Sequence, residues 1–275
     1  YNVINKYLGG ICMKLGFIGV GNMGKAILEG LLRSGKVSST DVFVRNSSDR
    51  STRSVAEETG AVFCNSLKEV VENSDIVFLG VKPYLVGTVL DEVSLSLKDK
   101  IVISMAAAVE INDLEKKLPE TKIVRIMPNT PVKIGSGVVG VTFNSLVIAE
   151  EKTLVLDLLN NLGIAEEILE KDMEALTALS GSGPAYGYLF IEALADGAVL
   201  NGLKRDVAYS LAASTVLGAA KMVLETKEHQ GKLKDDVCSP SGSTIEAVRV
   251  LEEKNFRSVV IECEKACFDK LNRMK

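Results

Sequence analysis

The 275-residue sequence contains a single histidine, no tryptophan and only 5% aromatic residues. It also lacks an excess of positive charge, because 32 Lys and Arg oppose 36 Asp and Glu and leave a net charge of −4. Without a basic surface a protein has little means of releasing counterions from a phosphate backbone, so no nucleic-acid partner is expected. The 47% hydrophobic and 25% charged residues are typical of a globular protein rather than a disordered or fibrous one.

The five cysteines are odd in number, scattered, and include no C-x-x-C pair. This pattern is typical of reduced thiols in a cytoplasmic protein. Cys263 and Cys267 are spaced to share one face of a helix. No third ligand follows nearby, so we expect two small packed side chains and no metal site.

A secretory signal and a run of 18 or more apolar residues are both missing from the sequence. The most apolar helical stretch, residues 211–224, is interrupted by Ser214, Thr215 and Lys221. We therefore expect a cytoplasmic protein with no membrane partner. Residues 1–12 precede a strand-like run that begins at Met13, and we interpret them as an upstream or expression-derived segment outside the fold.

Short β-rich runs alternate with amphipathic helical segments between residues 13 and 169, which indicates a parallel sheet flanked by helices. Strands are expected at residues 15–20, 42–45, 61–64, 76–81, 101–104 and 123–127, with two more near 138–143 and 164–169. Helices are expected at residues 24–34, 50–59, 67–73 and 113–118, the last with Asn112 as its N-cap.

Residues 170–275 show a helical period without β-branched runs, so we expect this half to be all helical. One helix is expected to begin at Pro184 and to end near Asn201, and a second to run from residue 206 to about 226. The second is rich in Ala, Gly and Ser, which let another helix approach closely. A domain with this much apolar helix surface commonly completes its core with a second subunit.

Three glycines, Gly19, Gly21 and Gly24, have the spacing G-x-G-x-x-G between a predicted strand and a predicted helix. The first permits a tight turn, the second lets the backbone approach a pyrophosphate, and the third lets the helix pack on the strand. Glycines also mark ordinary turns, but at the first strand-to-helix junction they favour dinucleotide binding. Segments after the fourth and fifth strands share the edge of the sheet where ligands bind. The residues expected to bind the cofactor are Ile18, Gly19, Val20, Gly21, Asn22, Met23, Gly24, Arg45, Asn46, Ser47, Asn65, Val81, Lys82, Pro83, Met105, Ala106 and Ala107.

The end of the second predicted strand favours NADPH over NADH. NAD enzymes usually place an Asp or Glu there, against the ribose 2′-hydroxyl, whereas this chain has Arg45, Asn46 and Ser47. An arginine followed by small hydrogen-bond donors suits a 2′-phosphate. Two alternatives stay open: Arg45 and Arg50 are solvated surface charges, or Asp49 reaches the ribose.

Two loops rich in Ser and Gly precede helices in the second half, at residues 180–186 (SGSGPAY) and 239–245 (SPSGSTI). With residues 127–131 (MPNTP) and 192–197 (EALADG), in this order behind the glycine motif, they resemble the pyrroline-5-carboxylate reductase family from about Met13 to the C-terminus. The resemblance implies reduction of 1-pyrroline-5-carboxylate to L-proline, the last step of proline biosynthesis, with NADPH preferred and NADH as the weaker alternative.

The resemblance also implies the fold class: α/β, with an N-terminal Rossmann-like NADP-binding domain, residues 13–169, followed by an all-α dimerisation and substrate domain, residues 170–275. A homodimer is expected, with further assembly of five dimers into a decamer.

The loop at residues 239–245 is the predicted substrate site, with Ser239, Gly242, Ser243 and Thr244 as the binding residues. Residues 243–246 (STIE) have the form of a capping box, so a helix from residue 244 to about 253 would present free N–H groups to a substrate carboxylate. The resemblance implies that Thr244 also contacts the ring nitrogen, as the catalytic residue. The alternative is a capping box that only begins a helix.

The chain departs from the family pattern at Ser241, which replaces a glycine, and at Ala107-Ala108, where the family usually has Ala-Gly. A positive φ at Ser241 would cost about 1 kcal/mol and could shift the loop. The loop at residues 180–186 is expected to shape the floor of the pocket, and direct contact with the substrate stays open.

The single His229 lies in a polar stretch and is expected to be solvated rather than to act as a base. A cyclic imine can arrive already protonated, so hydride transfer to its carbon depends on positioning and on exclusion of water, without a titrating side chain.

Two other functions stay open. A related imine or hydroxy-acid reductase would be expected to carry a catalytic lysine on the first long helix of the second half, and residues 186–200 contain none. A non-catalytic NADPH-sensing protein would keep the glycine motif, but it would have no reason to keep a polar substrate loop.

Overall fold

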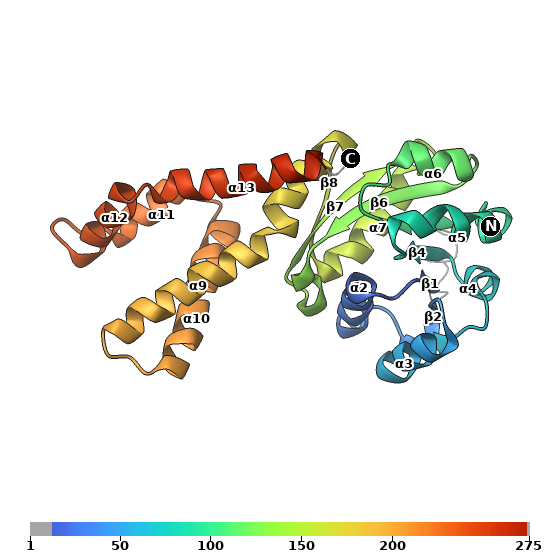
Figure 1. Ribbon diagram of the computed structural model, residues 1–275, viewed down its shortest axis with the longest axis horizontal. Coiled ribbons are helices and arrows are strands. Elements are labelled where there is room, and N and C mark those ends of the chain that lie inside the picture. The colour runs from blue at the N-terminus through green and yellow to red at the C-terminus, as the bar shows by residue number, and fades with distance from the viewer. Residues whose placement is uncertain (1–12, 274–275) are drawn as a thin grey trace. The chain divides into compact units, whose positions relative to one another are not determined.

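The structure, a computed structural model, describes residues 13–273, so the expectation for residues 1–12 lies outside the described part of the chain. The described residues divide into two compact units, 13–181 and 182–273. Each is described by itself below (Figure 1).

The first unit is built on an eight-stranded sheet in the order β3-β2-β1-β4-β5-β6-β7-β8. Its strands are β1 (Leu15–Ile18), β2 (Val42–Arg45), β3 (Val62–Phe63), β4 (Ile76–Leu79), β5 (Ile101–Ser104), β6 (Lys122–Pro128), β7 (Gly137–Phe143) and β8 (Gly163–Glu167). The first six strands pair in parallel, in the order of a Rossmann dinucleotide-binding fold. The expected strands are confirmed, with ends that differ by at most two residues.

The sheet is not parallel throughout, because β7 runs antiparallel to β6, and β8 then pairs in parallel with β7. Only residues 129–136 connect β6 to β7. A parallel pair needs a crossover connection of about a dozen residues or more, so this short link forces the chain to turn back on itself.

Helices cover both faces of the sheet and enclose a separate apolar core on each (Figure 1). The helices of this unit are α2 (Asn22–Arg33), α3 (Asp49–Thr59), α4 (Leu67–Glu72), α5 (Val86–Val93), α6 (Ile111–Lys117), α7 (Ala149–Leu159) and α8 (Met173–Leu176). Helices α2, α3 and α7 contribute to one core and α4, α5 and α6 to the other. On the first face the rings of Phe17 and Phe78 stack with their centroids 4.5 Å apart.

Short 3₁₀ turns connect these elements: η1 (Ser39–Asp41), η2 (Pro83–Leu85), η3 (Ser94–Ser96), η4 (Thr130–Ile134), η5 (Asn160–Leu162) and η6 (Glu170–Asp172). The unit ends in a π-helical turn, η7 (Thr177–Gly181).

The predicted N-cap of α6 is wrong. The helix begins at Ile111 after Glu110, so Asn112 lies inside its first turn. The cap comes instead from a distant residue, because the Glu170 carboxylate accepts a hydrogen bond from the Ile111 N–H at 2.8 Å. The same oxygen accepts from the buried Arg125 guanidinium at 2.8 Å. A local sequence pattern cannot reveal a cap that is supplied by tertiary structure.

The second unit is all helical in its described residues, as expected. It consists of α9 (Gly183–Leu200), α10 (Arg205–Thr226), α11 (Gln230–Val237), α12 (Ser243–Glu253) and α13 (Phe256–Asn272). Pro184 lies in the first turn of α9, as predicted. The buried hydrophobic side chains among the described residues of the second unit are Ala195, Ala208 and Ala212, so this unit has only a small core of its own.

Large apolar side chains are exposed along α9 and α10. Leu189 is 68% exposed and Leu217 is 66% exposed. By length and composition alone, α10 could cross a membrane, since an 18-residue window within its 22 residues reaches a mean hydropathy of 1.5. The sequence-based expectation had excluded such a segment on the basis of its polar interruptions.

Candidate functional site: a glycine-lined cleft and a polar loop

The turn between β1 and α2 is built around Gly19, which has a φ of +85°. Its N–H donates to the Arg45 carbonyl at 2.9 Å. A Cβ atom at Gly19 would lie 2.7 Å from Cγ1 of Val81 and 2.9 Å from the Gly80 carbonyl carbon. Both the positive φ and the close neighbouring strand therefore require glycine here.

The other two motif glycines have different surroundings. A Cβ at Gly24 would lie 2.9 Å from the Gly19 carbonyl oxygen, so this glycine lets α2 pack on the turn. At Gly21 a Cβ would meet nothing within 4 Å. Gly21 is the N-cap of α2, so the open space lies where the helix presents its first N–H groups. Such a space fits a pyrophosphate held against the backbone.

A cleft of about 650 Å³ opens at this edge of the sheet, where β1, β4 and β5 end. Fourteen of the predicted cofactor residues line it: Gly19, Val20, Gly21, Asn22, Met23, Gly24, Asn46, Ser47, Val81, Lys82, Pro83, Met105, Ala106 and Ala107. They come from segments separated by up to some eighty residues of chain, and the sheet brings them together. Lys82, one of the predicted cofactor residues, is the one titratable side chain of this lining.

Three predicted cofactor residues do not line the cleft. Ile18 is 2% exposed and belongs to a hydrophobic core. Arg45 pairs with Asp49, at 2.6 Å between Nη1 and Oδ1. Asn65 donates through its backbone and side-chain nitrogens to the Glu69 carboxylate, at 2.7 Å and 3.3 Å.

Three residues that the sequence analysis missed do line the cleft: Ser51, Gly80 and Leu85. Gly80 could have been predicted from the sequence, because it lies near the end of the fourth predicted strand, at the ligand edge of the sheet. A Cβ at Gly80 would overlap the Gly19 carbonyl oxygen. Ser51 and Leu85 reach the cleft only because α3 and η2 fold back towards the glycine turn, and no local pattern marks them.

Asn46 connects the glycine turn to the start of α3. Its Oδ1 accepts from the Val20 N–H at 2.5 Å, and its Nδ2 donates to the Ser51 carbonyl at 3.3 Å. Its backbone N–H donates to the Thr52 hydroxyl at 3.0 Å. The carboxamide therefore holds the second predicted cofactor segment against the first.

The predicted substrate loop lies in the helical unit, between α11 and α12. Ser241 has a φ of 60°, the left-handed conformation that a glycine would adopt more easily. The turn closes with the Gly242 N–H donating to the Ser239 carbonyl at 3.0 Å. A Cβ at Gly242 would overlap the Ser239 hydroxyl, so a larger residue here would force that side chain to move.

The predicted capping box is wrong. Helix α12 begins at Ser243 with Gly242 as its N-cap, and no side chain caps it. The Glu246 carboxylate, which a capping box would use, instead accepts from Nε and Nη2 of Arg249, at 3.0 Å and 2.7 Å. Because the left-handed Ser241 turns the chain early, the helix begins one residue sooner than expected and its first turn lacks a side-chain acceptor.

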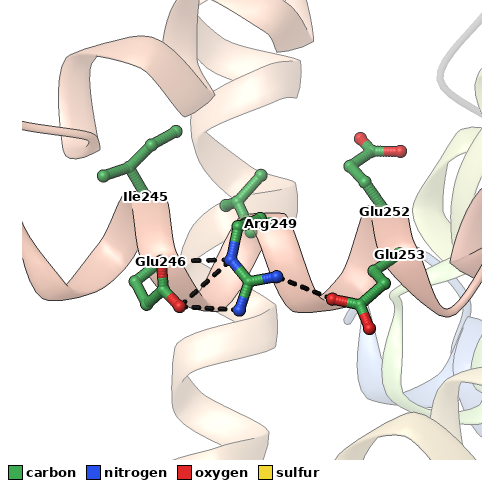
Figure 2. Close-up of a pocket in the computed structure, with 6 residues that line it drawn as sticks. Ile245, Glu246, Arg249, Glu252 and Glu253 are labelled. Atoms are coloured by element: carbon green, nitrogen blue, oxygen red, sulfur yellow. Dashed lines mark hydrogen bonds and ion pairs between the residues drawn. The ribbon is translucent and has the colours of Figure 1, made fainter.

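A pocket of about 690 Å³ lies along α12, and Figure 2 shows the side chains that line this hollow. Arg249 lies in the middle of this hollow and pairs with Glu246 and Glu253, three and four residues away. These are exposed pairs along one helix, whose charges are already balanced. We assign this hollow no chemistry.

The loop at residues 180–186 contains a small polar cluster. The hydroxyl of Ser182 lies 3.1 Å from the thiol sulfur of Cys267 on α13. Burial raises the pKa of Tyr186 to about 12, and the neighbouring Cys267 adds to the shift. The phenol therefore stays protonated across the physiological range.

His229 acts as the N-cap of α11, where its Nδ1 accepts from the Gly231 N–H at 3.0 Å. The residue is exposed. Among residues 13–273 no three His, Cys, Asp or Glu side chains are grouped so as to hold a metal ion.

Comparisons with known proteins agree with this architecture. A family described as pyrroline-5-carboxylate reductase dimerisation matches residues 170–274, and one described as NADP oxidoreductase coenzyme F420-dependent matches residues 14–108. Pyrroline-5-carboxylate reductase of Escherichia coli K12 is 48% identical over 263 residues, which cover 95% of this chain and 98% of that protein.

Solved structures give the same result. Pyrroline carboxylate reductase of Plasmodium falciparum with NADP bound has a TM-score of 0.83 at 36% identity, covering 95% of this chain and 98% of the other. The pyrroline-5-carboxylate reductase of Coxiella burnetii has a TM-score of 0.88 at 34% identity, with coverage of 96% and 99%. The likeness extends over both units, and this chain is an oxidoreductase that belongs to the pyrroline-5-carboxylate reductase family.

Proposed function

We propose that the protein reduces 1-pyrroline-5-carboxylate to L-proline, with NADPH as the preferred hydride donor and NADH as the weaker alternative. One observation carries the proposal: the cleft that joins the glycine turn, Asn46 and Ser47, and the small residues Ala106 and Ala107 along one edge of the sheet. Bound there, the reduced nicotinamide would supply the hydride.

The glycine turn is the proposed site of the pyrophosphate. Gly21 leaves the space open, and the first N–H groups of α2 carry the positive end of the helix dipole. The proposed adenosine 2′-phosphate site is the end of β2, where Asn46 and Ser47 line the cleft and Arg45 lies next to them in the chain. Ala106 and Ala107 would leave room for a flat ring.

The loop of Ser239, Gly242, Ser243 and Thr244 is the proposed substrate site. No side chain caps the first turn of α12, so its N–H groups can receive the substrate carboxylate without an Arg or Lys. Thr244 is the proposed contact of the ring nitrogen. Since the imine nitrogen can carry its proton on arrival, these residues need only bind the substrate, orient it and exclude water.

A homodimer is proposed for the helical unit, with further assembly into a decamer of five dimers. The support is the matched dimerisation family together with the exposed apolar side chains of α9 and α10. A second copy would cover these side chains, which gives the apolar surface of α10 a protein partner instead of a membrane. Light scattering on the purified protein tests the number of subunits.

We also propose that the enzyme acts in the cytoplasm. The support is the set of free cysteines, Cys64, Cys238, Cys263 and Cys267.

The decisive experiment mixes purified protein with NADPH and pyrroline-5-carboxylate and follows oxidation of the cofactor, with NADH in a parallel series. We expect turnover that Thr244→Ala lowers by about tenfold or more, because a misplaced reacting atom loses that much rate. Thr153→Ala removes an exposed threonine hydroxyl on α7 and serves as the matched control with unchanged turnover. Turnover of a 2-keto acid alone, or binding of NADPH without any turnover, would contradict the proposal.

A further inference from the structure

Asn129, directly after β6, joins three segments of the first unit. Its Oδ1 accepts from the Val138 N–H at 2.8 Å, and its Nδ2 donates to the Ser180 carbonyl at 3.0 Å. Its backbone N–H also donates to the Val138 carbonyl at 3.2 Å. With 6% of its surface exposed, Asn129 makes these bonds in a dry environment, where a hydrogen bond is worth more than at the surface.

The Ser180 carbonyl has a specific need for this donor. In a continuous α-helix it would accept from the N–H four residues later, but that residue is Pro184, which has none. Ser180 is buried and lies in the π-helical turn η7, which separates α8 from α9. Asn129, just after β6, therefore supplies the donor that the helix itself lacks.

The position of this bond links it to the cleft. Asn129 follows the carboxyl end of β6, and β1, β4 and β5 end at the same edge, where the cleft opens. Just beyond Ser180 in the chain, Ser182 contacts Cys267. Single π-helical turns inside helices frequently occur at functional sites. The bond thus fixes the turn by which the chain leaves the ligand edge of the sheet.

We propose that Asn129 is a positioning residue for imine reduction, which acts through the Ser180 carbonyl by supplying the donor that holds the turn η7 in place. The inference rests on the proposed function, in which the substrate is held by the helical half and the cofactor by the sheet. The turn is bonded to the edge of the sheet at which the cofactor is proposed to bind, and rate is steeply sensitive to small displacements of the groups that position the reacting atoms.

The test combines two substitutions. Asn129→Ala removes the donor, and Pro184→Ala restores an N–H at the position that the Ser180 carbonyl would use in an α-helix. Asn144→Ala is the matched control. Asn144 is also buried, follows β7 at the other end of the same hairpin, and likewise accepts from a strand N–H (Ile123, 3.0 Å) and donates to a carbonyl (Thr121, 3.1 Å).

We expect Asn129→Ala to lower kcat for the imine by about tenfold or more while the KM for NADPH changes less than about twofold. Amide hydrogen exchange in residues 177–182 should become faster. The double variant Asn129→Ala, Pro184→Ala should regain most of the lost kcat, although the Val138 N–H remains without its acceptor. Asn144→Ala should lower the melting temperature comparably and keep kcat. If Asn129→Ala does not fold, Asn129→Asp, which keeps the acceptor for Val138, replaces it.

An unchanged kcat in Asn129→Ala, an equal loss in Asn144→Ala, or a loss that Pro184→Ala does not reverse would each overturn the inference. Unchanged exchange at residues 177–182 would overturn it as well, and this readout does not depend on activity. A wild-type protein that fails to reduce the imine would instead refute the proposed function, so the two failures are distinguishable.

Discussion

The guanidinium of Arg45 donates to the carboxylate of Asp49, with 2.6 Å between Nη1 and Oδ1. The two residues lie at the end of β2 and the start of α3, on either side of Asn46 and Ser47, which line the cleft. Arg45, whose charge suits a 2′-phosphate, is thus already paired with Asp49, the acid that could reach the ribose. The pair therefore bears directly on the choice between NADPH and NADH.

Removal of Asp49 is predicted to strengthen the preference for NADPH. In Asp49→Asn the ion pair with Arg45 and the repulsion between carboxylate and phosphate are both lost, so the KM for NADPH should fall severalfold. Arg45→Ala should raise this KM by about tenfold or more, because a charge-assisted hydrogen bond is worth roughly 1.5–3 kcal/mol. Steady-state kinetics with both cofactors measures the effect.

The KM for NADH should change little in either variant, since NADH has no 2′-phosphate. Arg53→Ala is the control. Arg53 lies on α3, as Asp49 does, but its guanidinium stacks on the Phe63 ring, 4.6 Å from the ring centroid. Equal changes for NADPH and NADH would show that Arg45 does not read the phosphate.

Alanine at two of the motif glycines is predicted to affect different properties: cofactor affinity at one and thermal stability at the other. At Gly21 a Cβ meets no protein atom within 4 Å, so Gly21→Ala should fold with nearly unchanged stability and lose NADPH affinity by about tenfold or more. At Gly24 the Cβ would press on the Gly19 carbonyl oxygen, so Gly24→Ala should lower the melting temperature by several degrees. Calorimetry with and without NADPH separates the two. A Gly21→Ala variant that binds NADPH normally would place the cofactor elsewhere.

Glycine at residue 241 is predicted to stabilise the protein. Ser241 has a φ of 60°, so Ser241→Gly removes backbone strain and should raise the free energy of unfolding by about 0.5–1 kcal/mol after the added chain entropy is counted. Denaturant unfolding measures this change. Ser243→Gly, in the first turn of α12, should destabilise instead. A loss of stability in Ser241→Gly would mean that the Ser241 side chain makes a compensating interaction.

Stability is predicted to fall at high pH through Cys64. Burial raises the pKa of this thiol from 9.0 to about 11, and the nearby Glu69 adds to the shift. The folded state therefore keeps the proton while the unfolded state loses it, so this stabilisation is complete below pH 9 and is lost as pH rises towards 11. The loss should be about 2 kcal/mol.

Denaturant unfolding of wild type and of Cys64→Ala, at pH 8 and pH 11, isolates this contribution from other groups that titrate there. The difference in free energy between the two proteins should shrink at pH 11. A difference that is the same at both values would show that the thiol does not titrate in this window.

The sequence was most informative where the structure depends on local periodicity. The strands β2 and β5 begin and end where they were predicted. Their apolar residues are consecutive in the sequence, which is the pattern of a strand that is buried between two layers of helices. The glycine turn was predictable because Gly19 must adopt a positive φ. The caps of α6 and α12 were not, because Glu170 arrives from 59 residues away and Ser241 adopts a conformation that its residue type disfavours.

The sequence alone determined the alternation of strands and helices, the glycine turn and the polar loop, because each depends on residues close together in the chain. Tertiary structure decided which side chains meet. It buried Ile18 in a core, tied Arg45 to Asp49, brought Ser51 and Gly80 to the cleft and joined Asn129 to Ser180. Such contacts depend on how the sheet orders its strands and turns back at β7, and these long-range arrangements leave no pattern among neighbouring residues.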